Sequence, residues 1–427
     1  MTYALRAFFA ARGDEKMKTN KPIIESLLDL DYYKLTMLRF IFRYYRGVPV
    51  KFSFTNRTKS IRIADTVDER ELRAELSHVE TLRFTKRELE YIAADPHFND
   101  SEFLEFLAGL RLPPLHIEKA DGTYRIWAEG SWENETLWET IVLAVANEIY
   151  CRSFLKGLAK KEIRAIYREG DDRLDEKIAA LKKHPGIKFS EFGTRRRWSK
   201  SWQKHVTMRF AEEIPENLLG TSNIHLAMNL GLVPIGTMAH ELFMALFGIR
   251  FDANNRDCVA DSHSEVLDKW RELYGDELSV ALTDTYGTDF FLKTLTDKQA
   301  RDWKGFRQDS GSPFDCGDKI IANLKNRGIN PASKLLVPSD GLDVGKMISI
   351  EEYFRVHINK SFGWGTNATN DLGFKTLSLV MKLVEANGNP TVKLSDNLAK
   401  SLGPPELVLW VKEACGYVNT KSEELIY

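Results

Sequence analysis

The sequence has few cysteines, almost no net charge and no long apolar run, and each of these shortages excludes a class of protein. The four cysteines (Cys151, Cys258, Cys316 and Cys415) lie far apart and form neither a Cys-x-x-Cys pair nor a zinc-type Cys/His spacing. We therefore expect no disulfide framework, and unpaired thiols are typical of a cytoplasmic protein. No apolar stretch approaches the ~20 residues that a membrane span needs, so we expect no membrane-spanning segment.

The small net charge excludes partners that depend on a long-range electric field. Lys and Arg together number 60 and Asp and Glu number 61, which leaves a formal charge of −1 at pH 7. A chain so balanced does not attract nucleic acid or an anionic membrane over a distance, and we expect neither as a partner. Any anion must be bound by a local cluster of cations or backbone N–H groups.

The chain is long enough for more than one domain. It has 427 residues, of which 43% are hydrophobic and 28% are charged, and this composition is typical of a globular protein with two domains. We predict a loose extension at residues 1–20 and an α+β domain at 21–186. A β/α barrel-like catalytic domain is expected at 187–396, followed by a C-terminal segment at 397–427 that packs back on the first domain.

A repeated unit of short apolar strand, polar loop and helix predicts the architecture of the second domain. Strand ends are expected near residues 192, 220, 237, 283, 306, 337 and 362. A barrel brings all loops at the carboxyl ends of its strands to one face, which an open sheet does not do equally well. We therefore predict the α/β class, with an irregular or incomplete β/α barrel and a second, α+β domain. A hairpin is expected at residues 378–393.

The stretch that contains His240 predicts two successive strand-to-helix junctions. At the first, residues 220–223 form a tight turn before a helix that begins at Ile224. At the second, an apolar strand at residues 232–235 leads to a helix that begins at His240 and Glu241. A helix start favours bound anions, and a neighbouring carboxylate such as that of Glu241 can raise the basicity of an imidazole. The alternative is that His240 only caps a loop.

A planar aromatic residue, Phe192, is followed closely by Arg195, Arg196 and Arg197. A flat carboxylated ring could stack on Phe192 while an arginine binds its carboxylate with two parallel hydrogen bonds. Two alternatives stay open at this point. The arginines could form a solvated basic helix start, or together with the tryptophans that follow they could contact nucleic acid.

Three later loops combine aspartate with glycine directly after expected strands. Glycine-rich turns can direct N–H groups at phosphate, and aspartate can bind ribose hydroxyls or magnesium. Each loop alone is an ordinary turn sequence, but three at successive strand ends favour a phosphate site. Their residues are Arg307, Asp309, Ser310 and Gly311 in the first loop, Asp340 and Gly341 in the second, and Gly363, Gly365 and Thr366 in the third.

Seven short motifs, taken together and in order, resemble those of the ATP-coupled nicotinate phosphoribosyltransferases. They are Leu-Asp-Leu-Asp-Tyr-Tyr-Lys at 28–34, Glu-Phe-Gly-Thr-Arg-Arg-Arg at 191–197, Gly-Thr-Ser-Asn at 220–223, Gly-Thr-Met-Ala-His-Glu at 236–241, Arg-Gln-Asp-Ser-Gly at 307–311, Ser-Asp-Gly-Leu-Asp at 339–343 and Lys-Leu-Ser-Asp at 393–396. The resemblance implies the irregular barrel of type II phosphoribosyltransferases. It also implies a homodimer whose active sites are completed by the partner subunit.

The resemblance also implies the ligand of each motif. Nicotinate would stack between Phe192 and Tyr33 of the other subunit, with Arg195 and Arg307 near its carboxylate. The catalytic group would comprise His240, Glu241, Arg307 and Asp284, and phosphoribosyl pyrophosphate would lie among Asp284, Asp309, Ser310, Gly311, Asp340, Gly341, Gly363, Gly365 and Thr366. His240 matches the histidine that ATP phosphorylates transiently. Gln308 departs from the pattern, because many relatives carry His there.

Ser222 bears on the choice of ring substrate, because relatives that prefer nicotinamide carry Asp at this position. The implied reaction joins nicotinate to phosphoribosyl pyrophosphate and forms nicotinate mononucleotide and pyrophosphate for NAD salvage. ATP would be a cosubstrate and Mg²⁺ a cofactor, with metal-binding residues that the sequence leaves open. The alternatives are a nicotinamide or quinolinate phosphoribosyltransferase, or a catalytically silent barrel that binds phosphate or RNA.

Overall fold

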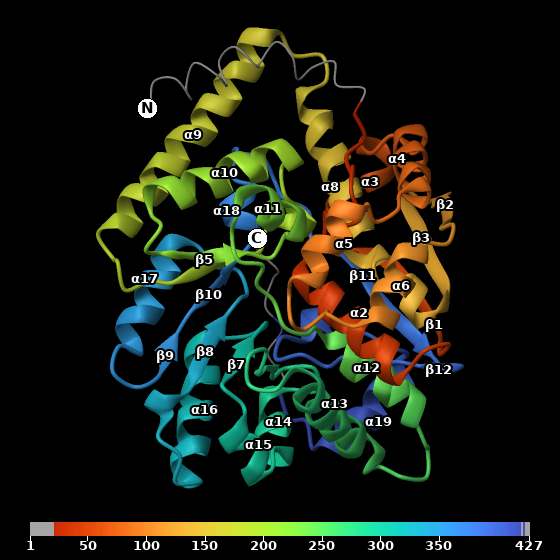
Figure 1. The fold of residues 1–427 in the computed structure, drawn as a ribbon, viewed down its shortest axis with the longest axis vertical. Coiled ribbons are helices and arrows are strands. Elements are labelled where there is room, and N and C mark those ends of the chain that lie inside the picture. The colour runs from red at the N-terminus through yellow and green to blue at the C-terminus, as the bar shows by residue number, and fades with distance from the viewer. Residues whose placement is uncertain (1–20, 420–421, 423–427) are drawn as a thin grey trace.

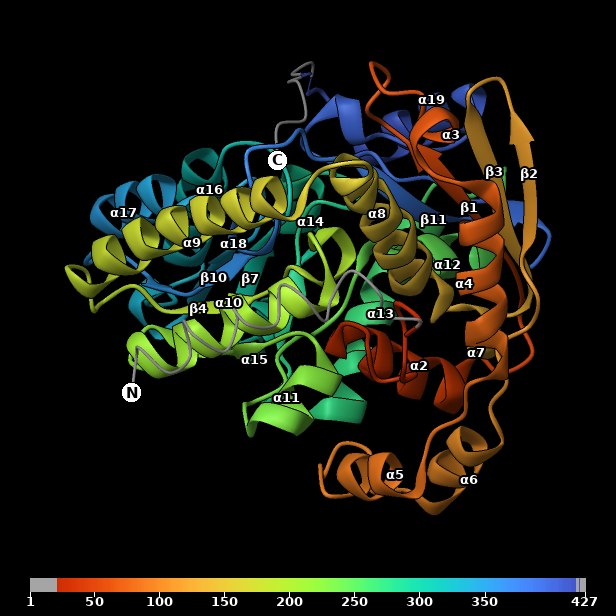
Figure 2. The same cartoon turned by 90° about the horizontal axis from the view of Figure 1, so that it is seen from above.

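A computed structural model describes residues 21–419 and 422. The extension expected at residues 1–20 lies outside this range. The chain forms one antiparallel sheet and two parallel sheets, which lie side by side (Figures 1 and 2).

The antiparallel sheet has five strands in the order β12-β11-β1-β3-β2. Its strands are β1 (Pro49–Asn56), β2 (His116–Ala120), β3 (Thr123–Ser131), β11 (Leu379–Ala386) and β12 (Asn389–Pro390). The hairpin expected at residues 378–393 therefore exists, but β11 pairs with β1 along the whole of β1 from Val50 onward. This hairpin belongs to the sheet of the first domain, whereas the boundaries drawn from the sequence placed it in the second.

The first half of the chain also forms several helices. They are α2 (Tyr32–Tyr44), α3 (Ile63–Thr66), α4 (Glu69–Thr81), α5 (Lys86–Ala93), α6 (Ser101–Gly109), α7 (Trp132–Glu135), α8 (Trp138–Leu155) and α9 (Lys160–Lys182). Trp132 and Trp138 are fully buried, as expected of core residues. Residues 132–155 form two helices, α7 and α8, because the chain turns at Thr136, whose hydroxyl donates to the carboxylate of Glu241.

The parallel strands form an incomplete barrel, as predicted. They are β4 (Phe189–Glu191), β5 (Leu218–Thr221), β6 (Val280–Leu282), β7 (Gly305–Gln308), β8 (Leu335–Pro338), β9 (Asn359–Lys360) and β10 (Phe362–Trp364). One sheet has the order β10-β4-β5 and the other β6-β7-β8-β9. Residues 359–364 join the two sheets, because β9 pairs with β8, β10 pairs with β4, and the N–H of Ser361 between them donates to the carbonyl of Leu336 at 3.1 Å.

The strand expected at residues 232–235 does not form. Only a single bridge joins Pro234 to Thr221. The backbone N–H of Thr221 donates to Val233 at 3.1 Å, and that of Ile235 donates to Thr221 at 2.9 Å. Residues 232–239 therefore form a loop that runs from the edge of β5 to the start of the next helix.

The helices of the second half follow the parallel strands. They are η2 (Thr194–Arg196), α10 (Lys200–Glu213), α11 (Ile224–Leu230), α12 (His240–Arg250), α13 (Cys258–Tyr274), α14 (Thr288–Thr294), α15 (Asp297–Asp302), α16 (Pro313–Asn326), η3 (Pro331–Ser333), α17 (Val344–Tyr353), α18 (Thr366–Thr369), η4 (Leu398–Lys400) and α19 (Pro405–Cys415). In α11 the side chain of Asn223 caps the first turn, and Gly231 ends the helix in the left-handed conformation.

The C-terminal segment packs mainly against the second half of the chain. Trp410 of α19 contacts Phe247 and Phe251, and Glu413 pairs with Arg256 at 2.7 Å. The expected packing against the first domain is limited to contacts such as that of Arg57, which donates to the carbonyl of Lys400 at 3.1 Å.

Two expectations from composition can be compared with the described residues. All four cysteines are buried and free. Among the helices described for residues 21–419, none has the length and apolar character to cross a bilayer.

A buried ion pair joins the two halves of the chain. Arg197 binds Asp29 through two hydrogen bonds of 2.6 and 3.0 Å, and both side chains are at most 1% exposed. Asn223 donates to the same carboxylate at 2.8 Å, and Asn147 donates to the carbonyl of Arg197 at 2.8 Å. Of the three consecutive arginines, Arg197 is therefore a structural residue.

We predict that Arg197→Met lowers the free energy of unfolding by about 3–5 kcal/mol, because it leaves the carboxylate of Asp29 buried and unpaired. Arg209→Met removes a partly exposed arginine that pairs with Asp175 at 2.7 Å, and should cost no more than about 1 kcal/mol. Urea unfolding measures both variants. Equal costs for the two would contradict the assigned role of Arg197.

Candidate functional site

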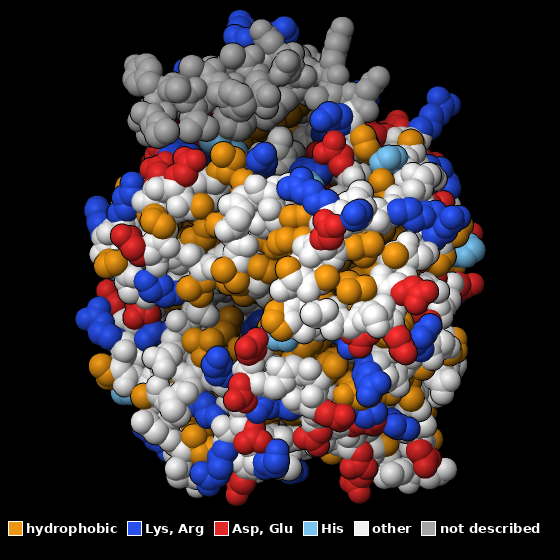
Figure 3. Space-filling view, in the orientation of Figure 1, with side chains coloured by type: hydrophobic (Ala, Val, Ile, Leu, Met, Phe, Trp, Pro, Cys, Tyr) orange, Lys and Arg blue, Asp and Glu red, His pale blue; other side chains and the backbone are white. Residues whose placement is uncertain are grey.

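The loops that follow β6, β7, β8 and β10 meet the start of α12 at one end of the incomplete barrel. In the space-filling view this face is hollowed between β8 and α2, and hydrophobic side chains and side chains of both charges border the hollow (Figure 3). Side chains from distant parts of the sequence therefore converge there, as the barrel architecture predicts.

His240 is the first residue of α12 and is 3% exposed. Its Nδ1 lies 3.0 Å from the hydroxyl of Thr285, its Nε2 lies 3.0 Å from Asp309 Oδ2, and Asp284 Oδ1 is 3.8 Å from Nε2. Burial and, to a smaller extent, nearby Lys393 lower the pKa of His240 to about 4, although Asp284 and Asp309 oppose the shift. The imidazole is therefore neutral at pH 7.

The partners of the neutral ring determine which nitrogen carries the proton. Burial acts to raise the pKa of Asp309, but Arg307 and His240 outweigh it and hold that pKa well below its ordinary value. An ionised carboxylate can only accept, so Nε2–H of His240 donates to Asp309. The lone pair of Nδ1 is then directed at the hydroxyl of Thr285. Reasoning from the sequence missed Thr285, although it lies in the loop directly after Asp284.

Glu241 does not act on the imidazole in the way expected. Its carboxylate points away from His240 and bonds the ammonium of Lys34, the indole N–H of Trp132 at 2.7 Å and the hydroxyl of Thr136 at 2.6 Å. The carboxylates that do lie near the ring are those of Asp309 and Asp284. The physical reason is the geometry of the first helical turn, which directs adjacent side chains to different sides.

Asp284 and the first aspartate loop form one hydrogen-bonded group. Ser310 donates to Asp284 Oδ2, and Ser395 donates to Ser310 at 2.7 Å. Gln308 donates to the carbonyls of Ser310 at 3.0 Å and Gly311 at 2.9 Å. Gln308 stands where many relatives carry His, and its side-chain amide stabilises this loop through these two hydrogen bonds.

Asp284 Oδ1 has the properties of a magnesium ligand. It is buried and has no hydrogen-bond partner among the described residues, and it lies on the same side of His240 as Asp309. Mg²⁺ is usually bound by one or two protein carboxylates together with substrate phosphates. The residues present therefore fit a metal ion that arrives with a phosphorylated substrate.

Two lysines that the expected site did not include lie beside these aspartates. Lys400 pairs with Asp340 Oδ1 at 2.6 Å and donates to the carbonyl of Asp309 at 2.9 Å. Lys393 is 4% exposed, and its burial lowers its pKa to about 7 although Asp284 and Asp309 oppose the shift. The Lys-Leu-Ser-Asp motif was the available signal for Lys393. The ammonium of Lys400 adds positive charge beside these aspartates, and Lys393, with a pKa of about 7, is protonated in about half of the molecules at pH 7.

The glycines of the later loops have different physical roles. Gly311 and Gly341 have φ values of 70° and 55°, so their turns favour glycine. A Cβ on Gly363 would lie 2.7 Å from the ring of Phe192, and one on Gly365 would lie 3.2 Å from the Phe192 carbonyl. The pair after β10 thus makes room for Phe192. Next to them, Thr366 is the first residue of α18.

The two arginines expected to bind a ring carboxylate have different partners. The guanidinium carbon of Arg195 lies 5.8 Å from the centre of the Tyr33 ring, and its Nε lies 3.6 Å from Asp31. Arg307 donates to Asp309 Oδ1 at 3.2 Å, to Ser339 at 3.2 Å and to the carbonyl of Met238 at 3.0 Å.

Tyr33 reaches this region within the same chain, whereas the resemblance implied that it comes from the other subunit. Its backbone packs against Gly236, and its hydroxyl is buried with no hydrogen-bond partner in the described part of the chain. Ser222 lies nearby and donates to Asp31 Oδ1 at 2.6 Å. Because Tyr33 packs on Arg195, the two aromatic residues Tyr33 and Phe192 border the same η2 turn.

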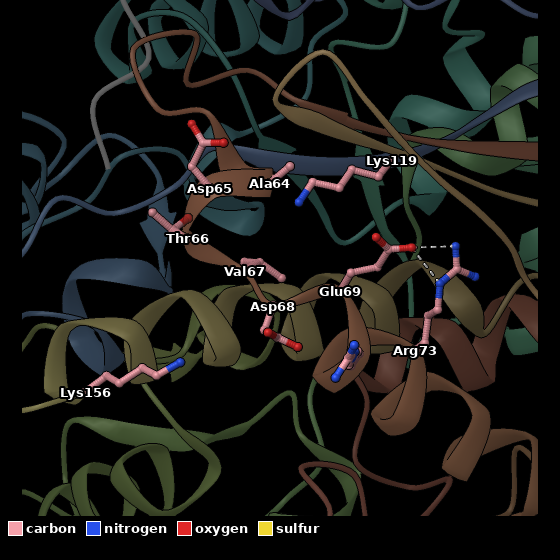
Figure 4. A pocket seen from close by; sticks show the side chains of 10 residues that line it. Ala64, Asp65, Thr66, Val67, Asp68, Glu69, Arg73, Lys119 and Lys156 are labelled. Carbon is pink, nitrogen blue, oxygen red and sulfur yellow. Dashed lines mark hydrogen bonds and ion pairs between the residues drawn. The ribbon is translucent and has the colours of Figure 1, made fainter.

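A second hollow, of about 520 Å³, lies on the first half of the chain (Figure 4). It is lined by residues of α3 and α4 and by two lysines: Ala64, Asp65, Thr66, Val67, Asp68, Glu69, Arg70, Arg73, Lys119 and Lys156. Arg73 pairs with Glu69 at 2.9 Å within it. None of the expected site residues lines this hollow.

Comparison with known proteins identifies the family. The chain matches the model of the nicotinate phosphoribosyltransferase (NAPRTase) N-terminal domain over residues 28–147 and that of the nicotinate phosphoribosyltransferase (NAPRTase) family over residues 187–421. The crystal structure of nicotinate phosphoribosyltransferase from Porphyromonas gingivalis is 30% identical, with a TM-score of 0.82 over 92% of this chain and 100% of that one.

Two further crystal structures are similar over nearly the whole chain. The nicotinate phosphoribosyltransferase from Vibrio cholerae is 33% identical over 93% of this chain and 94% of that one, with a TM-score of 0.82. A putative nicotinate phosphoribosyltransferase from Saccharomyces cerevisiae is 32% identical over 94% of this chain and 100% of that one, with a TM-score of 0.83. The chain belongs to the nicotinate phosphoribosyltransferase family.

Proposed function

We propose that the chain transfers a phosphoribosyl group from phosphoribosyl pyrophosphate to nicotinate, in a reaction coupled to ATP hydrolysis through a phosphohistidine at His240. One observation carries this proposal. The carboxylate of Asp309 binds His240 through one oxygen and Arg307 through the other, at 3.0 and 3.2 Å. The neutral imidazole, which can act as a nucleophile, and an arginine suited to bind a ring carboxylate thus both donate to the carboxylate of Asp309.

The transfer step is mainly electrostatic. The ring nitrogen of nicotinate forms a bond to C1 of the ribose while the bond from C1 to the pyrophosphate oxygen breaks, and pyrophosphate leaves with the electron pair. Arg195 and Arg307 would hold the nicotinate carboxylate, and Lys393 and Lys400 would face phosphate oxygens. Asp284 and Asp309 would hold Mg²⁺, which neutralises charge on the leaving group when bound.

The coupling step uses the lone pair that Asp309 leaves on Nδ1 of His240. This nitrogen forms a bond to the γ-phosphorus of ATP, the bond from that phosphorus to the bridging oxygen breaks, and ADP leaves with the electron pair. Water later cleaves the labile N–P bond. Thr285 would support Nδ1 before the reaction by donating a hydrogen bond to it.

The direct test is an assay of the purified protein with phosphoribosyl pyrophosphate and each candidate ring, with and without ATP. The proposal predicts pyrophosphate and nicotinate mononucleotide from nicotinate, at a rate or affinity that ATP improves. Preferential use of nicotinamide or quinolinate would assign a related transferase. Lack of pyrophosphate with all three rings would favour a barrel that binds phosphate or RNA without catalysis.

Replacement of the nucleophile tests the phosphohistidine. His240→Asn keeps a hydrogen-bonding nitrogen but removes the attacking lone pair, so we expect no acid-labile phosphoenzyme and no stimulation by ATP. A slow formation of nicotinate mononucleotide without ATP should remain. His225→Asn is the matched control, because His225 is a second partly buried histidine, located on α11. Labelling of His240→Asn with γ-³²P ATP at the wild-type level would show that His240 is not the acceptor.

The pH dependence of phosphorylation tests the low pKa of His240. A histidine with an ordinary pKa would lose about 25-fold in neutral imidazole between pH 7 and pH 5. With a pKa of about 4, the imidazole of His240 stays largely neutral from pH 7 to pH 5. Protonation removes the nucleophile only at a pH lower than this range. We expect the single-turnover rate of phosphoenzyme formation, measured with saturating ATP, to change less than about twofold. A fall with a midpoint near pH 6.5 would contradict the proposed environment.

The last part of the proposal concerns the assembly of subunits. The homodimer implied by the resemblance is still a prediction. We infer that one chain supplies both aromatic residues of its ring site. Mixing Tyr33→Ala and Phe192→Ala proteins should then restore no activity under conditions that let subunits exchange. A site shared between subunits would instead restore about a quarter of the sites, because half of the dimers would be mixed and each would contain one intact site. The cytoplasmic location expected from cysteine usage likewise remains a prediction.

A further inference from the structure

We propose that Glu241, Lys34 and Glu139 are positioning residues that transmit the state of His240 to Arg195 in the ring site. This inference rests on the proposed function and names the route by which ATP acts on nicotinate binding. The chain of contacts runs from the first turn of α12 through α2 and α8 to the η2 turn.

The route is a row of alternating charges with little access to water. The ammonium of Lys34 bonds Glu241 Oε2 and lies 2.7 Å from Glu139 Oε2, and these three side chains are at most 4% exposed. On its other side, Glu139 Oε1 lies 2.7 Å from Lys382 and 4.0 Å from Arg195. The carboxylate of Glu139 is therefore shared between cations from different elements, and the ammonium of Lys34 is shared between carboxylates from two helices.

The first contact of the row is attached directly to the proposed phosphate acceptor. Glu241 follows His240 in the first turn of α12. Its second carboxylate oxygen is held by Trp132 and Thr136 at 2.7 and 2.6 Å. A displacement of the helix start therefore has to change the contact of Glu241 with Lys34, because the carboxylate has no free oxygen with which to compensate.

The far end of the row includes the residues expected around nicotinate. Lys34 is adjacent to Tyr33 on α2, and Tyr33 packs on Arg195. The same helix touches the loop before His240 a second time, where the hydroxyl of Thr36 donates to the carbonyl of Thr237 at 2.6 Å. Helix α2 thus contacts both the start of α12 and the ring site.

Electrostatics in a buried environment makes such a row sensitive to change. Burial acts to lower the pKa of Lys34, but Glu139 and Glu241 outweigh it and raise that pKa above its ordinary value. The ammonium is thus charged and depends on both carboxylates. A phosphate on His240 adds about −1.5 to −2 charges close to Glu241. The expected response is a shift of Lys34 and Glu139 that changes the position of Arg195.

The experiment compares Glu241→Gln with Glu135→Gln in the full-length protein. Glutamine keeps the size of the side chain and an acceptor oxygen for Trp132 and Thr136, but it removes the charge that balances Lys34. Glu135 is a matched control, because it is a buried glutamate, 1% exposed, on the same α7 segment that contacts Glu241 and has one oxygen without a hydrogen-bond partner in the described residues. Two quantities are measured: acid-labile phosphoenzyme, and the ratio of KM for nicotinate without and with ATP.

We expect Glu241→Gln to form the phosphoenzyme while the KM ratio falls to within about twofold of one. Glu135→Gln should keep the wild-type ratio. A wild-type ratio in Glu241→Gln would overturn the inference, and so would a loss of phosphoenzyme together with the ratio, since Glu241 would then act on His240 itself. If the wild-type protein forms no phosphoenzyme, the proposed function fails, and this result is distinct from the other two.

A second variant keeps the test valid if Glu241→Gln does not fold. Glu139→Gln removes a charge at the other end of the same row, away from His240. This variant should also form the phosphoenzyme, while its ratio of KM for nicotinate without and with ATP falls toward one. Where both variants fold, the double variant should lose no more of the ratio than either single variant, because the two changes interrupt one route. Independent, additive losses would show that the two glutamates act separately and would overturn the inference.

Discussion

The ammonium of Lys34 is fully buried, and its charge is tolerated only because the carboxylates of Glu241 and Glu139 face it from two sides. This requirement constrains three parts of the molecule at once. It fixes the first turn of α12, the start of α2 and the start of α8 relative to one another. The residues expected to bind substrates are attached to these same elements: His240 precedes Glu241, and Tyr33 precedes Lys34.

A second shared group, the carboxylate of Asp309, works on the opposite side of His240. It accepts from the imidazole and from Arg307, so it sets the tautomer of the histidine and the direction of the guanidinium together. Arg307 in turn holds the loop before α12 through the carbonyl of Met238. His240 is therefore linked to both arginines that are expected to bind nicotinate: its imidazole to Arg307 through Asp309, and its backbone to Arg195 through Glu241 and the buried row of charges.

Much of this arrangement could be predicted from local sequence patterns. The turn at 220–223 with its cap Asn223, the helix start at His240 and the aspartate–glycine loops all depend on residues that are close in sequence. The barrel class followed from their repetition. The family followed from the order of the motifs, and the comparisons confirm it.

The parts that could not be predicted depend on pairing between distant residues. The apolar run at 232–235 resembles a strand, but only a single bridge joins it to β5. Glu241 follows His240 in sequence, but a lysine from another helix determines where its carboxylate points. The hairpin that contains β11 completes a sheet that begins more than 300 residues earlier, with β1. No local pattern indicates these partners.

Hydrogen–deuterium exchange of the wild-type protein, with and without ATP and in the absence of nicotinate, tests the proposed connection most directly. The account predicts that ATP changes the exchange of residues 32–37 on α2 and of residues 193–197 around Arg195, in addition to residues 236–242 around His240. Changes confined to residues 236–242, with unaltered exchange in the other two segments, would contradict it.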